Sequence, residues 1–127
     1  MNDPLVSVVI PTYNRKEMLI RLIKSIKKST YKNLEIIVVD DASTDGTYEE
    51  IKRKFPDVKI VRNEKNLLLA ASRNIGIKNS KGKYIFLIDD DNVVDKNCIY
   101  ELVKSMENDK NIGIVGPIMY YYSDPKR

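Results

Sequence analysis

Short apolar runs alternate with amphipathic stretches along the chain, and this alternation constrains the fold more than any other feature. The apolar runs cover residues 5–10, 34–39, 58–61, 84–88 and 112–115. Most are continuous, which is typical of strands covered on both faces of a parallel sheet. Apolar residues at helical spacing lie between them: Leu19, Leu22, Ile23 and Ile26; Tyr48, Ile51 and Phe55; Ile99, Leu102, Val103 and Met106. The sequence predicts an α/β, Rossmann-like fold: a doubly wound, mostly parallel sheet with helices on both faces.

Polar clusters follow three of the predicted strands. They cover residues 11–15, 40–47 and 89–92. In open parallel sheets, ligands collect outside the carboxyl ends of the strands. We therefore expect the chemistry of this chain at that edge of the sheet.

The cluster after the fourth strand contains three consecutive carboxylates, Asp89, Asp90 and Asp91. Adjacent like charges raise one another's pKa and cost stability unless a cation lies among them. On an extended backbone, Asp89 and Asp91 point one way and Asp90 the other. Because Mg2+ is often held by one or two carboxylates together with phosphates and water, the run predicts a metal-diphosphate site. The alternative, acids preceding a helix near Asp95, explains Asp95 better than the three-residue run.

Composition excludes several other classes of protein. A chain of 127 residues predicts a single domain over 1–127, and no segment reaches the ~20 apolar residues of a membrane span. A lone cysteine, Cys98, excludes an internal disulfide framework and fits a reducing compartment. The absence of histidine excludes histidine-based catalysis and argues against zinc. We expect a cytoplasmic protein.

The net charge of +4 comes from lysines spread along the chain, including Lys24, Lys27 and Lys28. No run of aromatic residues interleaved with basic ones supports a nucleic-acid partner. Solvated helix faces explain these lysines, and peripheral association with the inner face of the membrane stays an alternative.

Two common nucleotide-binding motifs are missing. The turn after the first strand, residues 11–15, has no glycine, although a dinucleotide-binding fingerprint would place three there. None of the five glycines fits the spacing of a phosphate-binding P-loop. If this edge binds a diphosphate, it must do so through a cation.

Four segments together resemble a known family. Residues 6–15, 38–47, 71–76 and 82–91 look, in order and spacing, like the four successive signatures of family 2 glycosyltransferases. The resemblance covers nearly the whole chain. It implies a GT-A fold, a nucleotide-diphosphate-sugar donor, a Mg2+ or Mn2+ ion, and inversion at the anomeric carbon.

The resemblance also implies roles for the acidic run and for one arginine. Asp89 and Asp91 would form the DxD element: Asp91 would contact the metal directly, and Asp89 and Asp90 would reach the ribose or the metal's waters. Arg73, read as lying at the start of a helix, would contact the donor nucleotide or diphosphate; a simple surface arginine is the alternative. Leu68 departs from the family, because many members have glycine there.

Further roles concern the nucleobase. Asp41 resembles the residue that accepts the imide N–H of uracil, which favours UDP, and Asp40 would help to hold the loop. Pro11, Thr12 and Tyr13 would surround the base, with the tyrosine ring against it.

Local structure offers alternatives at neighbouring positions. Pro11 would also stop the strand, Asn14 would equally cap the following helix, and Thr47 would begin a capping box.

Transfer to an acceptor also requires a general base, and the sequence identifies none. Family members place the base well downstream of the DxD element, so we expect it beyond Arg127, with the segment that binds a sugar, lipid-linked or polysaccharide acceptor. The chain is then the donor-binding part of a longer enzyme. The alternatives are a non-catalytic nucleotide-binding module completed by another chain, and an interaction domain whose acidic edge binds only a cation.

Overall fold

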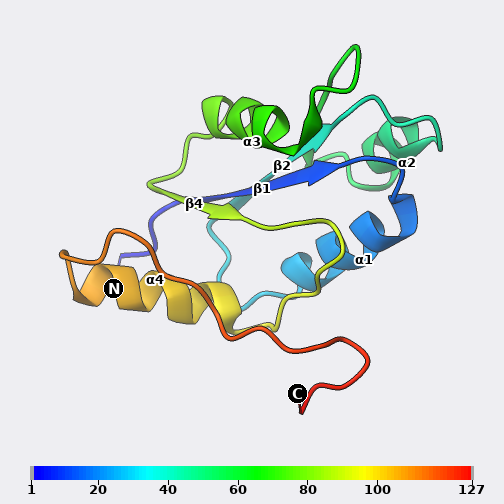
Figure 1. Cartoon of the computed structure of the whole chain (residues 1–127). Coiled ribbons are helices and arrows are strands. Elements are labelled where there is room, and N and C mark those ends of the chain that lie inside the picture. The colour runs from blue at the N-terminus through cyan, green and yellow to red at the C-terminus, as the bar shows by residue number, and fades with distance from the viewer. Residues whose placement is uncertain (1, 127) are drawn as a thin grey trace.

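The computed structural model describes residues 2–126 and shows one sheet with helices on both faces (Figure 1). In chain order the elements are β1 (Val6–Thr12), α1 (Lys16–Lys27), β2 (Leu34–Asp40), α2 (Thr47–Lys54), β3 (Lys59–Arg62), α3 (Leu68–Lys78), β4 (Tyr84–Leu87) and α4 (Cys98–Asn108). The four strands of the described range lie in the order β3-β2-β1-β4, and every pair is parallel. The predicted fold class is confirmed.

β1 lies inside the sheet, between β2 and β4, and sets the register of both. Thr12 pairs with Asp40 at the end of β2, and Val9 pairs with Leu87 at the end of β4. Because the strands are parallel, their carboxyl ends meet at one edge of the sheet. The polar segments that follow β1, β2 and β4 therefore emerge side by side, as the sequence predicts.

The two faces of β1 pack against different helices. Val8 and Ile10 belong to the core cluster that includes α1, whereas Val9 faces α3. A Cβ atom on Gly76 of α3 would clash with Cγ1 of Val9, so only glycine lets this helix approach the sheet so closely. Figure 1 shows α3 on one face of the sheet and α1 and α4 on the other.

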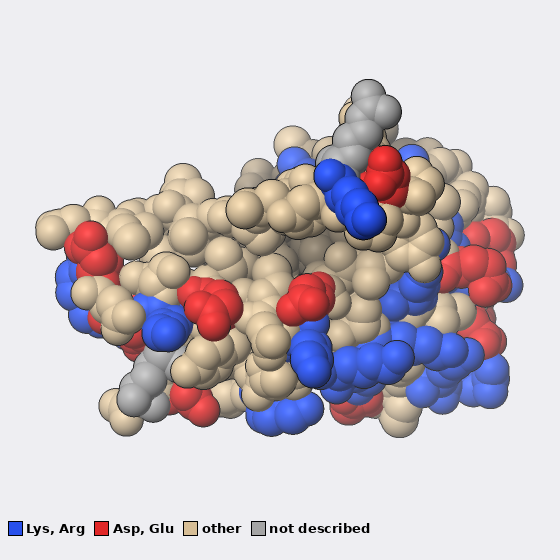
Figure 2. Space-filling model, turned by 90° about the horizontal axis from the view of Figure 1, so that it is seen from below, with Lys and Arg blue, Asp and Glu red and all other residues tan. Residues whose placement is uncertain are grey.

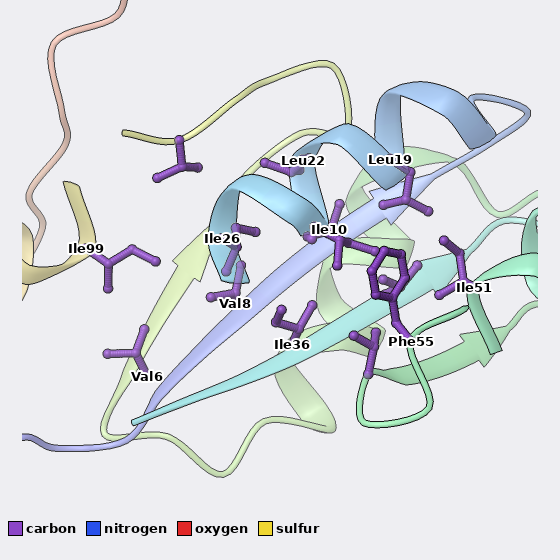
Figure 3. Packing of buried hydrophobic residues seen from close by; sticks show 14 of the residues in the cluster. Val6, Val8, Ile10, Leu19, Leu22, Ile26, Ile36, Ile51, Phe55 and Ile99 are labelled. Atoms are coloured by element: carbon purple, nitrogen blue, oxygen red, sulfur yellow. The ribbon is translucent and has the colours of Figure 1, made fainter. Parts of the chain in front are cut away.

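The apolar side chains predicted to line one face of α1 lie at the centre of the hydrophobic core. Leu19, Leu22 and Ile26 are fully buried, and Figure 3 shows them over Val8 of β1 and Ile36 of β2. Complete burial of one such side chain contributes about 1.5–3 kcal/mol. This packing fixes α1 against the strands whose ends form the polar edge.

The fifth strand expected at residues 112–115 is not formed. Ile114 is 94% exposed, and within residues 109–120 no strand is present. The run precedes Pro117, which has no amide hydrogen for a ladder. The segment instead passes α4 (Figure 1). Further along the chain, Cζ of Arg21 lies 4.3 Å from the ring centroid of Tyr122.

Two further observations concern helix length and surface charge. Among residues 2–126, no helix combines the length and apolar composition that crossing a bilayer requires. Figure 2 shows basic side chains gathered on the half of the lower face where Figure 1 places α1. Lys24, Lys27 and Lys28, at the end of this helix, are exposed, as expected for a solvated helix face.

Candidate functional site: a pocket at the carboxyl ends of the strands

A pocket of about 390 Å³ opens at the carboxyl ends of β1, β2 and β4. The end of β1, the segments that follow β1, β2 and β4, and the first turns of α3 line it: Pro11, Thr12, Tyr13, Arg15, Asp41, Leu68, Leu69, Ser72, Asp89, Asp90 and Asp91. The structure thus brings together seven of the nine site residues predicted from the sequence. Asp40 and Arg73 lie outside the lining.

The acidic run forms a turn. β4 ends at Leu87, and the amide of Asn92 donates to the carbonyl of Asp89 at 3.3 Å, closing a four-residue turn. The expected alternation of side chains, with Asp90 directed away from Asp89 and Asp91, is therefore wrong, because it applies only to an extended backbone. All three carboxylates line the same pocket.

Asp90 is the buried member of the turn and joins it to β1. The hydroxyl of Thr12 donates to Oδ2 of Asp90 at 2.9 Å, and Nη1 of Arg15 lies 3.2 Å from Oδ1. Burial raises the pKa of Asp90, although the Thr12 and Arg15 contacts act in the opposite direction. Its carboxylate therefore ties the turn to Thr12 of β1 and to Arg15.

Asp89 and Asp91 are about half exposed, and each faces an arginine. Nη2 of Arg73 donates to Oδ1 of Asp89 at 2.7 Å, and Nη1 of Arg15 lies 3.5 Å from Oδ2 of Asp91. Within residues 2–126, no three metal-binding side chains converge on one point. A donor set of one or two carboxylates nevertheless fits Mg2+ or Mn2+, since these ions complete an oxygen shell with phosphate and water.

Asp41 organises the loop between β3 and α3. Its carboxylate accepts hydrogen bonds from Nδ2 of Asn63 at 2.9 Å and from the backbone amides of Leu67 at 2.7 Å and Leu68 at 3.0 Å. Burial acts to raise the pKa of Asp41, but these hydrogen bonds outweigh it and hold the pKa below its usual value. Asp41 is therefore ionised, and it lies at the pocket while supporting one of its walls.

Asp40 is fully buried, and its Oδ1 accepts the amide hydrogen of Ser43 at 3.0 Å. This contact matches the expectation that Asp40 holds the loop. The start of α2 differs from the predicted capping box. The N-cap is Gly46 and makes no side-chain capping hydrogen bond, and Oδ1 of Asp45 accepts a hydrogen bond from the amide of Thr47 at 3.1 Å. Oδ2 of Asp45 also accepts the amide of Lys16 at 3.2 Å, so one carboxylate serves the first turns of α1 and α2.

Asn14 does not cap α1 either. The N-cap of that helix is Arg15, and Oδ1 of Asn14 instead accepts the amide of Thr44 at 2.8 Å. Pro11 does not stop β1, which continues to Thr12. The ring of Tyr13 is 45% exposed at the pocket, where it is free to meet a ligand.

A sequence model described as Glycosyl transferase family 2 matches residues 7–127 of the chain. The chain belongs to this family. An uncharacterised glycosyltransferase of Rickettsia conorii is 43% identical over 114 residues, which cover 88% of this chain and 19% of the relative. The residues matched by the family model include all those that line the pocket.

Solved structures of glycosyltransferases share the fold, and with the parallel sheet they establish it as GT-A. A mannosyltransferase from Pyrobaculum calidifontis, in complex with GDP-Man and Mn2+, has a TM-score of 0.75 and 28% identity, covering 81% of this chain and 32% of its own. S. aureus TarS 1-349, in complex with UDP-GlcNAc, has a TM-score of 0.75 and 26% identity, covering 81% and 31%. The chain therefore spans about a third of these proteins.

The position at which this family 2 chain departs from many members has an unusual backbone. Leu68 has a φ of 70°, in the left-handed region that favours glycine. α3 begins at this residue, so Arg73 lies in its second turn and not at the helix start, as the sequence suggested. Its guanidinium reaches the pocket's edge through Asp89.

Sequence reasoning missed four lining residues, Arg15, Leu68, Leu69 and Ser72, as site residues. Arg15 stands inside the first family signature, and this position was the available signal for it. Ser72 is buried and accepts a hydrogen bond from Nδ2 of Asn63 at 3.2 Å, a contact that requires the tertiary structure. The lining therefore includes a guanidinium, of Arg15, that composition and periodicity do not reveal.

Proposed function

We propose that this chain is the donor-binding part of a glycosyltransferase that transfers a sugar from a nucleoside diphosphate to an acceptor hydroxyl with inversion. UDP is the favoured nucleotide, and a Mg2+ or Mn2+ ion is held at the acidic turn. The proposal extends family membership to a substrate class, a metal site and a stereochemical course.

The balance of charge in the pocket carries the proposal. Its lining contains four carboxylates, of Asp41, Asp89, Asp90 and Asp91, and one guanidinium, of Arg15. An anionic diphosphate would be repelled by this excess of negative charge at close range. A divalent cation between the carboxylates and the phosphates removes the repulsion, because hard cations take oxygen ligands from both.

Size and similarity agree with a nucleotide ligand. The pocket volume of about 390 Å³ falls within the ~300–1,000 Å³ typical of small-molecule sites. Two similar structures are complexes, one with UDP-GlcNAc and the other with GDP-Man and Mn2+. These observations support a nucleotide-sugar ligand. The identity of its nucleobase is inferred from this chain's own residues.

We assign recognition of the nucleobase to Asp41 and Tyr13. A carboxylate has about four lone-pair sites, and Asp41 uses three for Asn63, Leu67 and Leu68. The fourth site, which the Ser72 hydroxyl also approaches, would accept an imide N–H, which uracil offers. The exposed ring of Tyr13 would lie against the base, with Pro11 and Thr12 beside it.

For the diphosphate, we assign Asp91 as the direct metal ligand and Asp89 as the second. The ion would supply charge stabilisation to the departing nucleoside diphosphate. Asp90 keeps the turn in place through Thr12, and Arg73 orients Asp89. We assign the general base and the acceptor site to a part of the whole enzyme outside these residues, and the cytoplasmic or membrane-associated location to that enzyme. The matched region covers 32% and 31% of the two solved chains.

Calorimetric titration of UDP and GDP, with and without Mn2+, tests the proposal. We expect UDP to bind only with Mn2+, and Asp91→Asn to lose at least about tenfold in affinity. The matched control is Asp57→Asn, an exposed aspartate away from the pocket that should bind like the wild type. Equal UDP binding without the metal, or by Asp91→Asn, would refute the metal assignment.

A further inference from the structure

Arg15 contacts two carboxylates of the acidic turn although it lies 75 positions before Asp90 in the sequence. Its Nη1 atom lies 3.2 Å from Oδ1 of Asp90 and 3.5 Å from Oδ2 of Asp91. Asp90 is buried and anchored by Thr12, whereas Asp91 is 51% exposed. The guanidinium is therefore fixed at one carboxylate and loosely held at the other.

Only one of its nitrogen atoms is engaged. Among residues 2–126, the polar contacts of the Arg15 guanidinium all use Nη1, and the side chain is 52% exposed. A guanidinium carries five N–H donors in a planar fork that matches phosphate oxygens. The remaining donors are available to a ligand in the pocket that Arg15 lines.

The charges of Arg15 and of the neighbouring carboxylates oppose the binding of either ligand alone. A divalent cation that approaches Asp91 meets the positive charge of Arg15 at that carboxylate. A diphosphate without a cation meets the carboxylates of Asp89 and Asp91. When both ligands arrive together, the cation takes the place of Arg15 at Asp91, and the freed donors face the phosphate.

We propose that Arg15 exchanges partners on ligand binding, neutralising Asp91 in the free protein and contacting the diphosphate when a divalent cation holds Asp91. The contact to buried Asp90 persists and acts as the pivot. Arg15 is then a ligand-binding residue that couples the two affinities, so that metal and nucleoside diphosphate bind together and weakly alone. This inference rests on the proposed function.

Two binding measurements on three proteins test the exchange: the wild type, Arg15→Gln and Arg15→Lys. Free Mn2+ is measured by electron paramagnetic resonance without nucleotide, and UDP binding is measured by calorimetry at saturating Mn2+. For Arg15→Gln we expect Mn2+ alone to bind several-fold tighter and UDP about tenfold weaker, since coupling energies typically correspond to ~5–150-fold. A gain in Mn2+ affinity together with a loss of UDP affinity is the result that the exchange predicts.

The lysine variant separates charge from geometry. Arg15→Lys keeps the positive charge at Asp91 but loses the fork, so Mn2+ alone should bind as in the wild type while UDP binds more weakly. Arg53→Gln, which removes an exposed arginine paired with Glu50 in α2, is the matched control and should change neither affinity.

The outcomes distinguish this inference from the proposed function. If the wild type binds UDP with Mn2+ but Arg15→Gln changes both affinities in the same direction or neither, the exchange is overturned and the proposed function stands. If the wild type does not bind UDP even with Mn2+, the proposed function and the exchange both fall.

Discussion

The backbone amide of Leu68 donates a hydrogen bond to Oδ2 of Asp41 at 3.0 Å, although Leu68 has a φ of 70° that leucine rarely adopts. The carboxylate thus holds the first residue of α3 in a strained conformation at the wall of the pocket. Such strain persists where the surroundings over-determine it, and it collects at ligand sites.

Replacing Leu68 with glycine should relieve this strain. A left-handed conformation costs an L-residue about 1–2 kcal/mol, and the extra freedom of glycine in the unfolded chain offsets roughly half of that. Because the Leu68 side chain is 73% exposed, little apolar burial is lost. We expect Leu68→Gly to raise the free energy of unfolding in urea by about 0.5–1 kcal/mol.

Leu68→Ala is the matched control, since it removes most of the side chain and keeps the Cβ atom that causes the strain. It should give no stabilisation. If alanine stabilised as much as glycine, the exposed leucine side chain, and not the backbone, would be the source.

The Thr12–Asp90 hydrogen bond should be needed to keep the acidic turn in place. Thr12→Val preserves shape but leaves the buried Oδ2 of Asp90 without its donor, so we expect about 1–2 kcal/mol of destabilisation at neutral pH. Thr12→Ser, which keeps the hydroxyl, should lose much less. Chemical denaturation of the three proteins measures the difference.

The pH dependence of that loss follows from the raised pKa of Asp90. A folded-state pKa above the unfolded value means that ionised Asp90 costs stability at neutral pH, and protonation at lower pH relieves the cost. The difference in unfolding free energy between Thr12→Val and the wild type should therefore decrease as the solution is acidified. A gap that widened in acid would contradict this account of Asp90.

Asp41 should be more important for stability than Asp91. In Asp41→Asn, an amide group would face the N–H donors of Asn63, Leu67 and Leu68, and we expect a loss of about 2–3 kcal/mol. In Asp91→Asn, only an exposed ion pair is lost, worth at most about 1 kcal/mol. Equal stabilities of the two variants would show that Asp41 does not organise the β3–α3 loop.

Glu107 of α4 should contribute to the loss of unfolding free energy at acidic pH. Lys110 and Lys83, opposed by partial burial and helped by Tyr84, lower the pKa of Glu107 from 4.5 to about 2. Because the folded pKa is depressed, the contribution is complete above 4.5 and is lost as the pH falls toward about 2. The difference in unfolding free energy between the wild type and Glu107→Gln should shrink across this range, and a constant difference would contradict the assignment.

Local patterns predicted the sheet and its polar edge well. Continuous apolar runs follow from burial of strands on both faces, and the stripe from Leu19 to Ile26 follows from burial of one helix face, so both can be recognised in the sequence. The convergence of Thr12, Asp41 and Asp89 follows from parallel strands ending at one edge. These inferences required periodicity and topology only.

Contacts between distant residues could not be predicted in the same way. Residues 112–115 have the composition of a strand, but a strand also needs a ladder partner, and Ile114 has none within the described range. The direction of Asp90 depends on the turn after Leu87, and its partner Arg15 lies 75 positions away. Such pairings depend on the tertiary arrangement and leave no local signal.

Crystals of the chain soaked with UDP and Mn2+, with data collected at the manganese absorption edge, test the central claim most directly. We expect one anomalous peak at bonding distance, about 2.2 Å, from a carboxylate oxygen of Asp91, with the UDP phosphates on its other side. Nucleotide bound in the pocket with no manganese beside Asp89 or Asp91, or manganese bound there without phosphate contact, would contradict the claim.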